Sequence, residues 1–260
     1  MAELRFALAL LAMNLKSSFA LRGAFWLQAG FMVANNVLYF AFWWIFFDRF
    51  EEVRGWQVRD VSALFGIVAM GFGAAVVFAG GMRELSRCVM DGDLDAYLTL
   101  PKSPLLHVVG SRTYASGWGD LCSGALFLLV SGRVTAETWP LAIVAVLCSA
   151  VVFVASGILI HSLAFWLGRI EAIARQAWDF LITFSIYPRP LFAGFLKILL
   201  FTLLPAGFIG YLPYELLRDF EWTGLLAAVG GALFYGALSL FVFGAGLRRY
   251  ESGNRFGVRI

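Results

Sequence analysis

Four long stretches without any charged residue are the feature that most constrains the fold of this chain. They cover residues 23–47, 61–82, 138–168 and 222–247. A helix needs about 20 mainly apolar residues to cross a hydrocarbon core about 30 Å thick, and each stretch is long enough. With 61% hydrophobic and 14% charged residues, the chain also has too little polar surface to cover a water-soluble core. The sequence therefore predicts an all-α integral membrane protein.

Two further regions are apolar but interrupted. Residues 107–132 carry His107, Arg112 and Asp120, so this span either starts late or places its charges against protein. Between residues 169 and 217, an aspartate, a lysine and several prolines divide the sequence, and this region holds at least one crossing. We expect six transmembrane helices in total, with both termini on the same side of the membrane.

The distribution of Lys and Arg predicts that this side is the cytoplasm, because cytoplasmic loops are enriched in these residues. With cytoplasmic termini, most of the 20 Lys and Arg residues lie on the cytoplasmic side. In a second topology, residues 190–217 enter the membrane from outside and return, which moves Arg189 and Lys197 to the outside. This topology accounts better for the prolines, because non-helical backbone at membrane depth is tolerated where it packs on protein or lines a cavity. Both topologies keep six crossings.

The N-terminal residues 1–22 hold a short apolar run followed by Asn14 and Lys16. A signal peptide would be followed by a small-residue cleavage site, and this sequence has none there. We therefore expect residues 1–22 to form a helix at the cytoplasmic interface. The whole chain, residues 1–260, is expected to form a single transmembrane domain.

The sequence lacks the motifs of several enzyme classes. None of its three lysines completes a phosphate-binding G-x-x-x-x-G-K-[ST] loop. Cys88, Cys122 and Cys148 are too widely spaced for a zinc site or a disulfide framework. His107 and His161 are too far apart for a helical metal motif, and no serine has the glycine pattern of a serine hydrolase. We expect no catalytic residue, metal or cofactor in this chain, and no nucleic-acid partner.

Arg112, Asp120 and His161 are the expected intramembrane polar residues. An isolated charge at the bilayer centre costs at least about 2.5 to 3.5 kcal/mol, so Asp120 must have a partner, face water or be protonated. Arg112 is eight positions earlier, about 12 Å along a helix, which is too far for a direct pair. We expect a partner on another helix or subunit, in a structural contact rather than in a substrate path. For His161 we expect a neutral side chain, hydrogen-bonded inside the bundle.

One loop on the predicted cytoplasmic side, residues 83–104, has an amphipathic pattern. Leu94, Tyr97, Leu98 and Pro101 form an apolar edge, while the neighbouring aspartates stay polar. This pattern is typical of a short helix that binds in a groove of another protein. On physical grounds alone, an ordinary solvated loop is an equal alternative.

Residues 92–104, G-D-L-D-A-Y-L-T-L-P-K-S-P, resemble the G-x-L-D-x-Y-L-x-x-P-x-x-P signature of bacterial type-2 ABC transporter permeases. The resemblance is to the branch that has six spans and about this length. A second stretch, Tyr187-Pro188 followed by P-A-G-F-I-G-Y-L-P at 205–213, is similar to the segment that precedes the last helix in that branch. Length, span count and orientation agree, so the resemblance covers essentially the whole chain.

The resemblance implies the membrane-spanning permease of an ATP-driven exporter in the bacterial cytoplasmic membrane. It implies that residues 83–104 couple to a separate cytoplasmic ABC ATPase subunit, which holds ATP and Mg. It also implies that residues 188–217 form an extracytoplasmic re-entrant hairpin. The remaining partners that it implies are a second permease subunit, identical or paralogous, and membrane lipid.

Site residues follow from the resemblance at matching positions. The expected ATPase-coupling residues are Arg83, Glu84, Arg87, Asp91, Gly92, Asp93, Leu94, Asp95, Tyr97, Leu98, Pro101 and Pro104. The expected re-entrant or gate residues are Tyr187, Pro188, Pro190, Pro205, Phe208, Tyr211 and Pro213. Family members often carry a basic residue just before the Asp-Gly pair, where this chain has Met90, and Arg83 or Arg87 is expected to take its place.

Two other functions compete with this interpretation. A secondary transporter would need coupling charges inside the bundle, and only Arg112, Asp120 and Asp179 are available, with no repeat relating two halves. A non-transporting membrane scaffold is the other alternative. The substrate does not follow from the sequence.

Overall fold

The structure is a computed structural model that describes residues 2–188, 201–202 and 204–251. Within this part, every regular element is a helix, and extended pairing is limited to one isolated bridge between Val53 and Trp56. The prediction of an all-α chain is therefore confirmed for the described residues.

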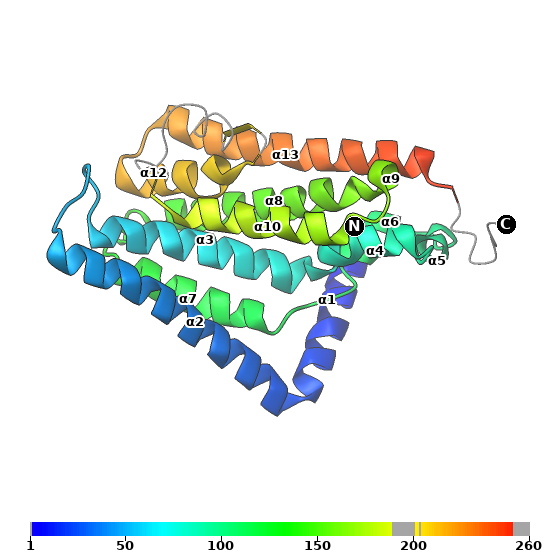
Figure 1. Ribbon diagram of the computed structural model, residues 1–260, viewed down its shortest axis with the longest axis horizontal. Helices are drawn as coiled ribbons and strands as arrows, with labels where there is room; N and C mark the ends of the chain where they lie inside the picture. The colour runs from blue at the N-terminus through cyan, green and yellow to red at the C-terminus, as the bar shows by residue number, and fades with distance from the viewer. Residues whose placement is uncertain (1, 189–200, 203, 252–260) are drawn as a thin grey trace.

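Most of the longer helices in the described part of the chain run along the long axis of the molecule (Figure 1). Four spans are long and apolar enough to cross a membrane: α2 (Arg22–Arg49), α3 (Val58–Phe78), α8 (Trp139–Ser162) continued by α9 (Ala164–Leu167), and α13 (Trp222–Arg249). Two shorter helices lie beside them, α7 (Ser116–Val130) with 15 residues and α10 (Glu171–Ile186) with 16. The described residues thus give four clear candidate spans where the sequence predicts six.

The helix α7 is short because it starts late. The apolar region of the sequence begins at residue 107. Its first residues belong to α6 (Pro104–Val109), which is capped by Gly110, and α7 begins only at Ser116. In between, the Tyr114 amide donates to the Val76 carbonyl at 3.2 Å, and the Thr113 hydroxyl donates to the Val77 carbonyl at 2.8 Å. These bonds hold the connection against the end of α3. Both alternatives for this span are observed in part: α7 starts late and leaves His107 and Arg112 outside it, whereas Asp120 lies within α7 and is buried against protein.

The two ends of the bundle differ in charge. One end holds the start of α1 (Ala2–Ala20), the end of α13, and the short helices η1 (Gly80–Glu84), α4 (Leu85–Met90), α5 (Leu94–Leu98) and α6 (Figure 1). We call it the basic end, because it carries Arg5, Lys16, Arg22, Arg83, Arg87, Lys102, Arg112, Arg169, Arg175, Arg248 and Arg249. The opposite end holds the connections 50–57 and 131–138 and α12 (Leu212–Arg218), with Arg49, Arg54, Arg59, Arg133 and Arg218.

The N-terminal helix α1 lies across the basic end at a steep angle to the bundle axis (Figure 1). The Phe6 ring lies 4.6 Å from the His107 ring, and the Asn14 side-chain amide donates to the Gly110 carbonyl at 2.6 Å. The helix expected over residues 1–22 is therefore present and packs on α6. Its place at a membrane interface stays a prediction.

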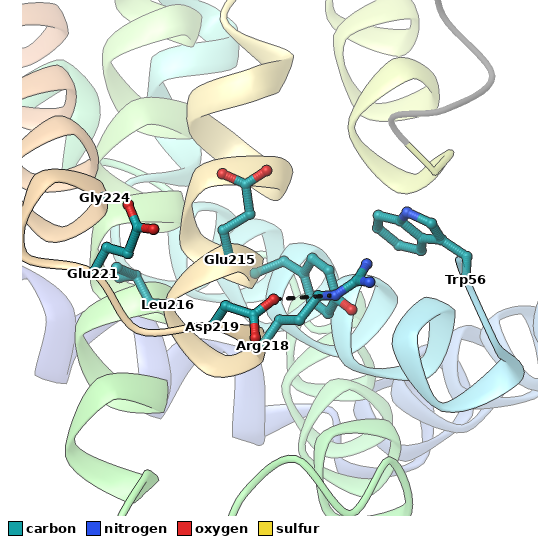
Figure 2. Close-up of a pocket in the computed structure, with 8 residues that line it drawn as sticks. Trp56, Glu215, Leu216, Arg218, Asp219, Glu221 and Gly224 are labelled. Atoms are coloured by element: carbon teal, nitrogen blue, oxygen red, sulfur yellow. Dashed lines mark ion pairs between the residues drawn. The ribbon is translucent and has the colours of Figure 1, made fainter. Parts of the chain in front are cut away.

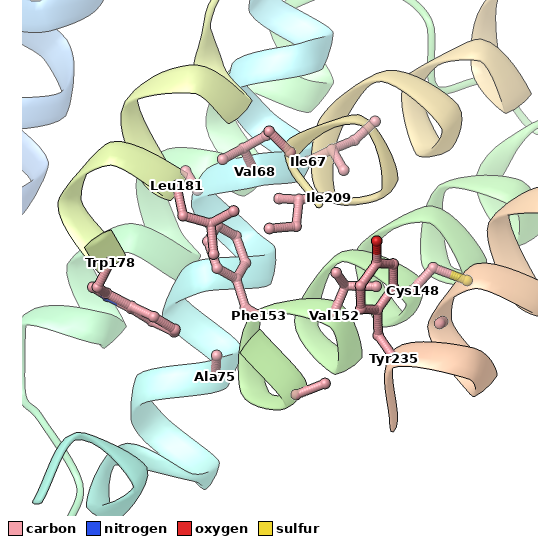
Figure 3. Packing of buried hydrophobic residues seen from close by; sticks show 14 of the residues in the cluster. Ile67, Val68, Ala75, Cys148, Val152, Phe153, Trp178, Leu181, Ile209 and Tyr235 are labelled. Carbon is pink, nitrogen blue, oxygen red and sulfur yellow. The ribbon is translucent and has the colours of Figure 1, made fainter. Parts of the chain in front are cut away.

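The core is built around α3, in which every residue from Asp60 to Ala69 is buried. Figure 3 shows Ile67, Val68 and Ala75 of α3 close to Val152 and Phe153 of α8, together with side chains of α10, η3 (Gly207–Tyr211) and α13.

Large apolar side chains also cover the outside, such as Trp26 on α2 (67% exposed) and Phe241 on α13 (73% exposed). An apolar interior with an apolar exterior is the arrangement that a bilayer requires, so this is an integral membrane protein.

Two glycine pairs allow α3 and α7 to approach closely. A Cβ atom added at Gly73 would lie 2.7 Å from the Gly117 carbonyl oxygen, and one added at Gly66 would lie 2.8 Å from the Gly124 carbonyl oxygen. Small residues at such positions let membrane helices pack backbone against backbone. The α3–α7 contact therefore depends on glycine at these positions.

Replacing Gly73 with alanine is expected to lower the free energy of unfolding by about 1–3 kcal/mol, because the two backbones must separate. Gly244→Ala on α13 is the matched control, since a Cβ atom there meets nothing within 4 Å. The measurement is unfolding of the detergent-solubilised protein followed by circular dichroism. Equal stability of the two variants would contradict the close approach.

Candidate functional site

The connection between α3 and α7 at the basic end folds into the short helices η1, α4, α5 and α6. Gly92 has a φ of +77°, a left-handed conformation that suits glycine, and it makes the turn between α4 and α5. Pro104 stands at the first position of α6, where its missing amide hydrogen costs nothing. The local backbone conformation therefore explains why the sequence motif has glycine at position 92 and proline at position 104.

Glu84 ties this segment to the start of α7. Its carboxylate accepts a hydrogen bond from Arg112 Nη1 at 3.0 Å and from the Tyr114 hydroxyl at 3.2 Å, and Arg87 Nη2 lies 3.4 Å away. Burial, together with the negative charge of Glu84, raises the pKa of the Tyr114 hydroxyl, so this group remains a donor. The Arg83 guanidinium lies over the Tyr114 ring, 5.1 Å from its centre.

Arg112 is not where the sequence placed it. We expected it among the intramembrane polar residues, but it lies ahead of α7 in the connection at the basic end, with a half-exposed side chain. The reason is the late start of α7, which leaves Arg112 beside Glu84. The charge that a secondary transporter would need inside the bundle is therefore absent at this position.

Two further contacts tie α4 to other helices. The Ser86 hydroxyl lies 2.9 Å from Nδ1 of His161, near the end of α8, and both side chains are buried. Arg169, in the connection before α10, lies 3.8 Å from the Asp91 carboxylate. The contact of His161 agrees with the hydrogen-bonded side chain expected inside the bundle.

The predicted apolar edge of α5 is divided between the core and the surface. Leu94 is fully buried, and the Tyr97 ring is half-buried and stacks on the His107 ring at 5.5 Å. Leu98 and Leu100 are each 44% exposed, and Pro101 is exposed as well. Leu94 therefore anchors the segment, which differs from its expected place on an exposed edge, and the surface available to a partner consists of Leu98, Leu100 and Pro101. The aspartates at 93 and 95 are half-buried.

Asp120 has its partner on another helix of the same chain. The Asn36 side-chain amide on α2 donates to Asp120 Oδ1 and to the Ser123 hydroxyl oxygen, each at 2.8 Å. Asp120 is only 2% exposed, and its Oδ2 atom accepts no hydrogen bond from the described part of the chain. This cluster joins α2 to α7 in the interior of the bundle.

The expected gate residues that the structure describes gather at the opposite end. Tyr187 directly follows α10 and its ring lies 5.8 Å from the Trp43 ring, while Pro188 is buried. The Tyr211 hydroxyl donates to the Phe184 carbonyl at 2.7 Å, and the Phe208 ring lies 5.4 Å from the Tyr235 ring. Pro205 is buried, and Pro213 stands in the first turn of α12. Pro190 lies outside the described residues.

A cavity of 360 Å³ opens beside α12 at the same end (Figure 2). Arg218 pairs with Asp219 at 3.5 Å, and its guanidinium lies 6.0 Å from the centre of the Trp56 ring. Glu215 and Glu221 add two carboxylates to the lining. The opposite end thus presents an acidic surface, whereas the basic end presents arginines.

Residues 33–254 match the family described as ABC-2 family transporter protein. The chain belongs to this family. No curated protein matches the chain, and no solved structure matches it either. The matched range runs from the middle of α2 to beyond the end of α13, so it includes the segment 83–104 and the described gate residues.

As an ABC-2 family protein, the chain is a membrane-embedded permease subunit, and the resemblance found in the sequence is confirmed. Membership also implies a partner, an ABC ATPase subunit, because a permease of this family is not itself the ATPase.

Sequence reasoning missed several of the residues that organise this ABC-2 permease. Tyr114, Arg169 and Asn36 all make contacts that fix the segment 83–104 or the α2–α7 pair. Only Asn36 left a signal, since two adjacent asparagines stand in the middle of the charge-free stretch 23–47. Asn36 is buried and Asn35 is exposed, a difference that depends on helix phase.

Replacing Asn36 with alanine is expected to lower the free energy of unfolding by about 1–3 kcal/mol, because Asp120 Oδ1 then loses its donor in a buried site. Asn35→Ala is the matched control and is expected to change stability by less than about 0.5 kcal/mol. The measurement is thermal unfolding in detergent. A result in which both variants unfold at the wild-type temperature would show that the buried hydrogen bond contributes nothing.

Proposed function

We propose that this ABC-2 permease is the membrane-spanning subunit of an ATP-driven exporter. A separate cytoplasmic ATPase subunit holds ATP and Mg, and it moves the bundle through the segment 83–104. The observation that carries the proposal is the exposed apolar surface of Leu98, Leu100 and Pro101. This surface belongs to a segment that contacts three spanning elements, in a chain of the ABC-2 family.

The contacts of the segment explain how a push on it would reach the bundle. η1 continues directly from α3, Glu84 holds the connection into α7, and Ser86 contacts His161 on α8. The Asp91–Arg169 pair adds the connection before α10. A displacement of α4 is therefore shared by several helices at once, as rigid-body gating requires.

The proposed topology has six crossings, with both termini in the cytoplasm of a bacterial cell. It is supported by the alternating direction of α2, α3, α7, α8, α10 and α13 between the two ends (Figure 1) and by the excess of arginine at the basic end. A helix of 16 residues is about 24 Å long, shorter than a hydrocarbon core, so α7 and α10 require local thinning of the bilayer or protein cover.

For the outer part of the permease we propose a re-entrant hairpin over residues 188–217, of which 189–200 and 203 lie outside the described residues. Its support is that η3 and α12 stay at the opposite end, packed against α8 and α13, and do not run toward the basic end (Figure 1). A second permease subunit, identical or paralogous, and surrounding lipid complete the proposed transporter. A secondary transporter is less well supported, since Arg112 lies outside α7.

Replacing Leu98 with aspartate is expected to reduce recovery of the ATPase with the tagged chain at least about tenfold, because a charge then enters an apolar contact. Leu98 is preferred to Tyr97 for this test. Tyr97 contacts His107, so a Tyr97 variant could lose the ATPase because the segment no longer folds correctly. The matched control is Ala136→Asp, which adds the same charge to an exposed position at the opposite end. Complexes are purified from native membranes and the ATPase is quantified. Undiminished recovery with Leu98→Asp would refute the docking role.

Cysteine labelling is expected to place the two ends on opposite sides of the membrane. In a Cys122→Ser background, an impermeant maleimide should label Ala136→Cys in intact cells, and it should label Ala96→Cys only after permeabilisation. Both positions are exposed, and the other two cysteines are buried. Labelling of both positions from the same side would exclude a crossing by α7.

A further inference from the structure

A second cavity, of 250 Å³, lies at the basic end between α10, η1 and the end of α8. Three arginines from different elements line it: Arg83 of η1, Arg87 of α4 and Arg175 of α10. His161 and Tyr114 add further hydrogen-bonding groups to the wall. The cavity is therefore lined by hydrogen-bonding groups from several elements.

The charge around this cavity is not balanced by the protein. The two carboxylates in the lining are Glu84 and Glu171, and Glu84 already forms ion pairs with Arg87 and Arg112. Within the described part of the chain, neither Arg83 nor Arg175 has a carboxylate within ion-pair distance. With Arg112 included, the cluster holds four guanidinium groups against two carboxylates.

The geometry around these groups suits a phosphate. A guanidinium group donates two parallel hydrogen bonds to a phosphate, and several arginines that converge on one cavity hold the anion more tightly than a single arginine does. The cavity also lies between the end of α8 and the start of α10, at the end of the bundle that the proposed topology places in the cytoplasm. Basic pockets between membrane helices on the cytoplasmic side bind anionic headgroups.

We propose that this cavity is a binding site for a phosphate group that carries a net negative charge, either in the headgroup of an anionic phospholipid or in a free phosphate compound. Arg175 and Arg83 supply the principal contacts, from two elements that are far apart in sequence. The proposal goes beyond the proposed transport function, because it needs neither the ATPase nor a cargo. Its position beside Glu84 gives a bound lipid direct access to the segment 83–104.

The test is native mass spectrometry of the purified full-length chain with three probes: dioleoyl phosphatidylglycerol, dioleoyl phosphatidylcholine and inorganic phosphate. Wild-type protein is expected to bind phosphatidylglycerol more tightly than phosphatidylcholine. Arg175→Gln and Arg83→Gln are each expected to weaken that binding about tenfold, the loss expected for one charge-assisted hydrogen bond. Arg249→Gln, which removes an exposed arginine at the same end outside the cavity, is the matched control.

The two sources of phosphate give different results. Dependence on Arg175 and Arg83 for phosphatidylglycerol alone identifies a lipid site, whereas the same dependence for inorganic phosphate identifies a site for a free phosphate compound. Equal binding by Arg175→Gln and Arg249→Gln, or a loss in only one of the two cavity variants, would overturn the proposal. Circular dichroism and gel filtration establish that each variant is folded. Since no ATPase is present, failure here leaves the docking role of Leu98 untouched.

Discussion

The close packing of α3 is the constraint on which the rest of the structure depends. This helix is buried along most of its length, and α7 reaches it only because glycines face each other at Gly66 and Gly124 and at Gly73 and Gly117. A side chain at any of these positions would push α7 outward. The hydrogen bonds that hold the connection to α7 against Val76 and Val77 then fix where α7 can begin.

From this packing follows the arrangement of the basic end. η1 leaves α3 without a flexible linker, so Glu84 stands close to Arg112 and Tyr114. Ion pairs this close to solvent contribute little to stability, about 1 kcal/mol or less. These ion pairs matter because they fix the position of the segment 83–104 against several helices. Leu98 and Leu100 remain exposed on the surface of that segment. The same crowding leaves an excess of arginine around the cavity beside α10.

Much of the fold follows from the sequence, because an uncharged run of 20 residues has few alternatives in a chain this apolar. The four long spans are predicted for that reason, whereas the α1 helix is predicted from a short apolar run followed by Asn14 and Lys16. The sequence leaves the start of α7 open between two alternatives, because that start depends on backbone bonds to α3. It does not predict the burial of Leu94, which depends on the direction of a five-residue helix. The Glu84–Arg112 pair joins residues 28 positions apart, and periodicity carries no information at that distance.

The central claim, that the segment 83–104 contacts an ATPase, is tested most directly by site-specific photocrosslinking in native membranes. A photoreactive amino acid is placed at Leu98 or, as the comparison, at Ala136 on the opposite end. The account predicts a crosslinked product from position 98 that contains an ABC ATPase subunit, and none from position 136. An ATPase that co-purifies with the chain but never crosslinks at position 98, or crosslinks equally at both positions, would contradict it.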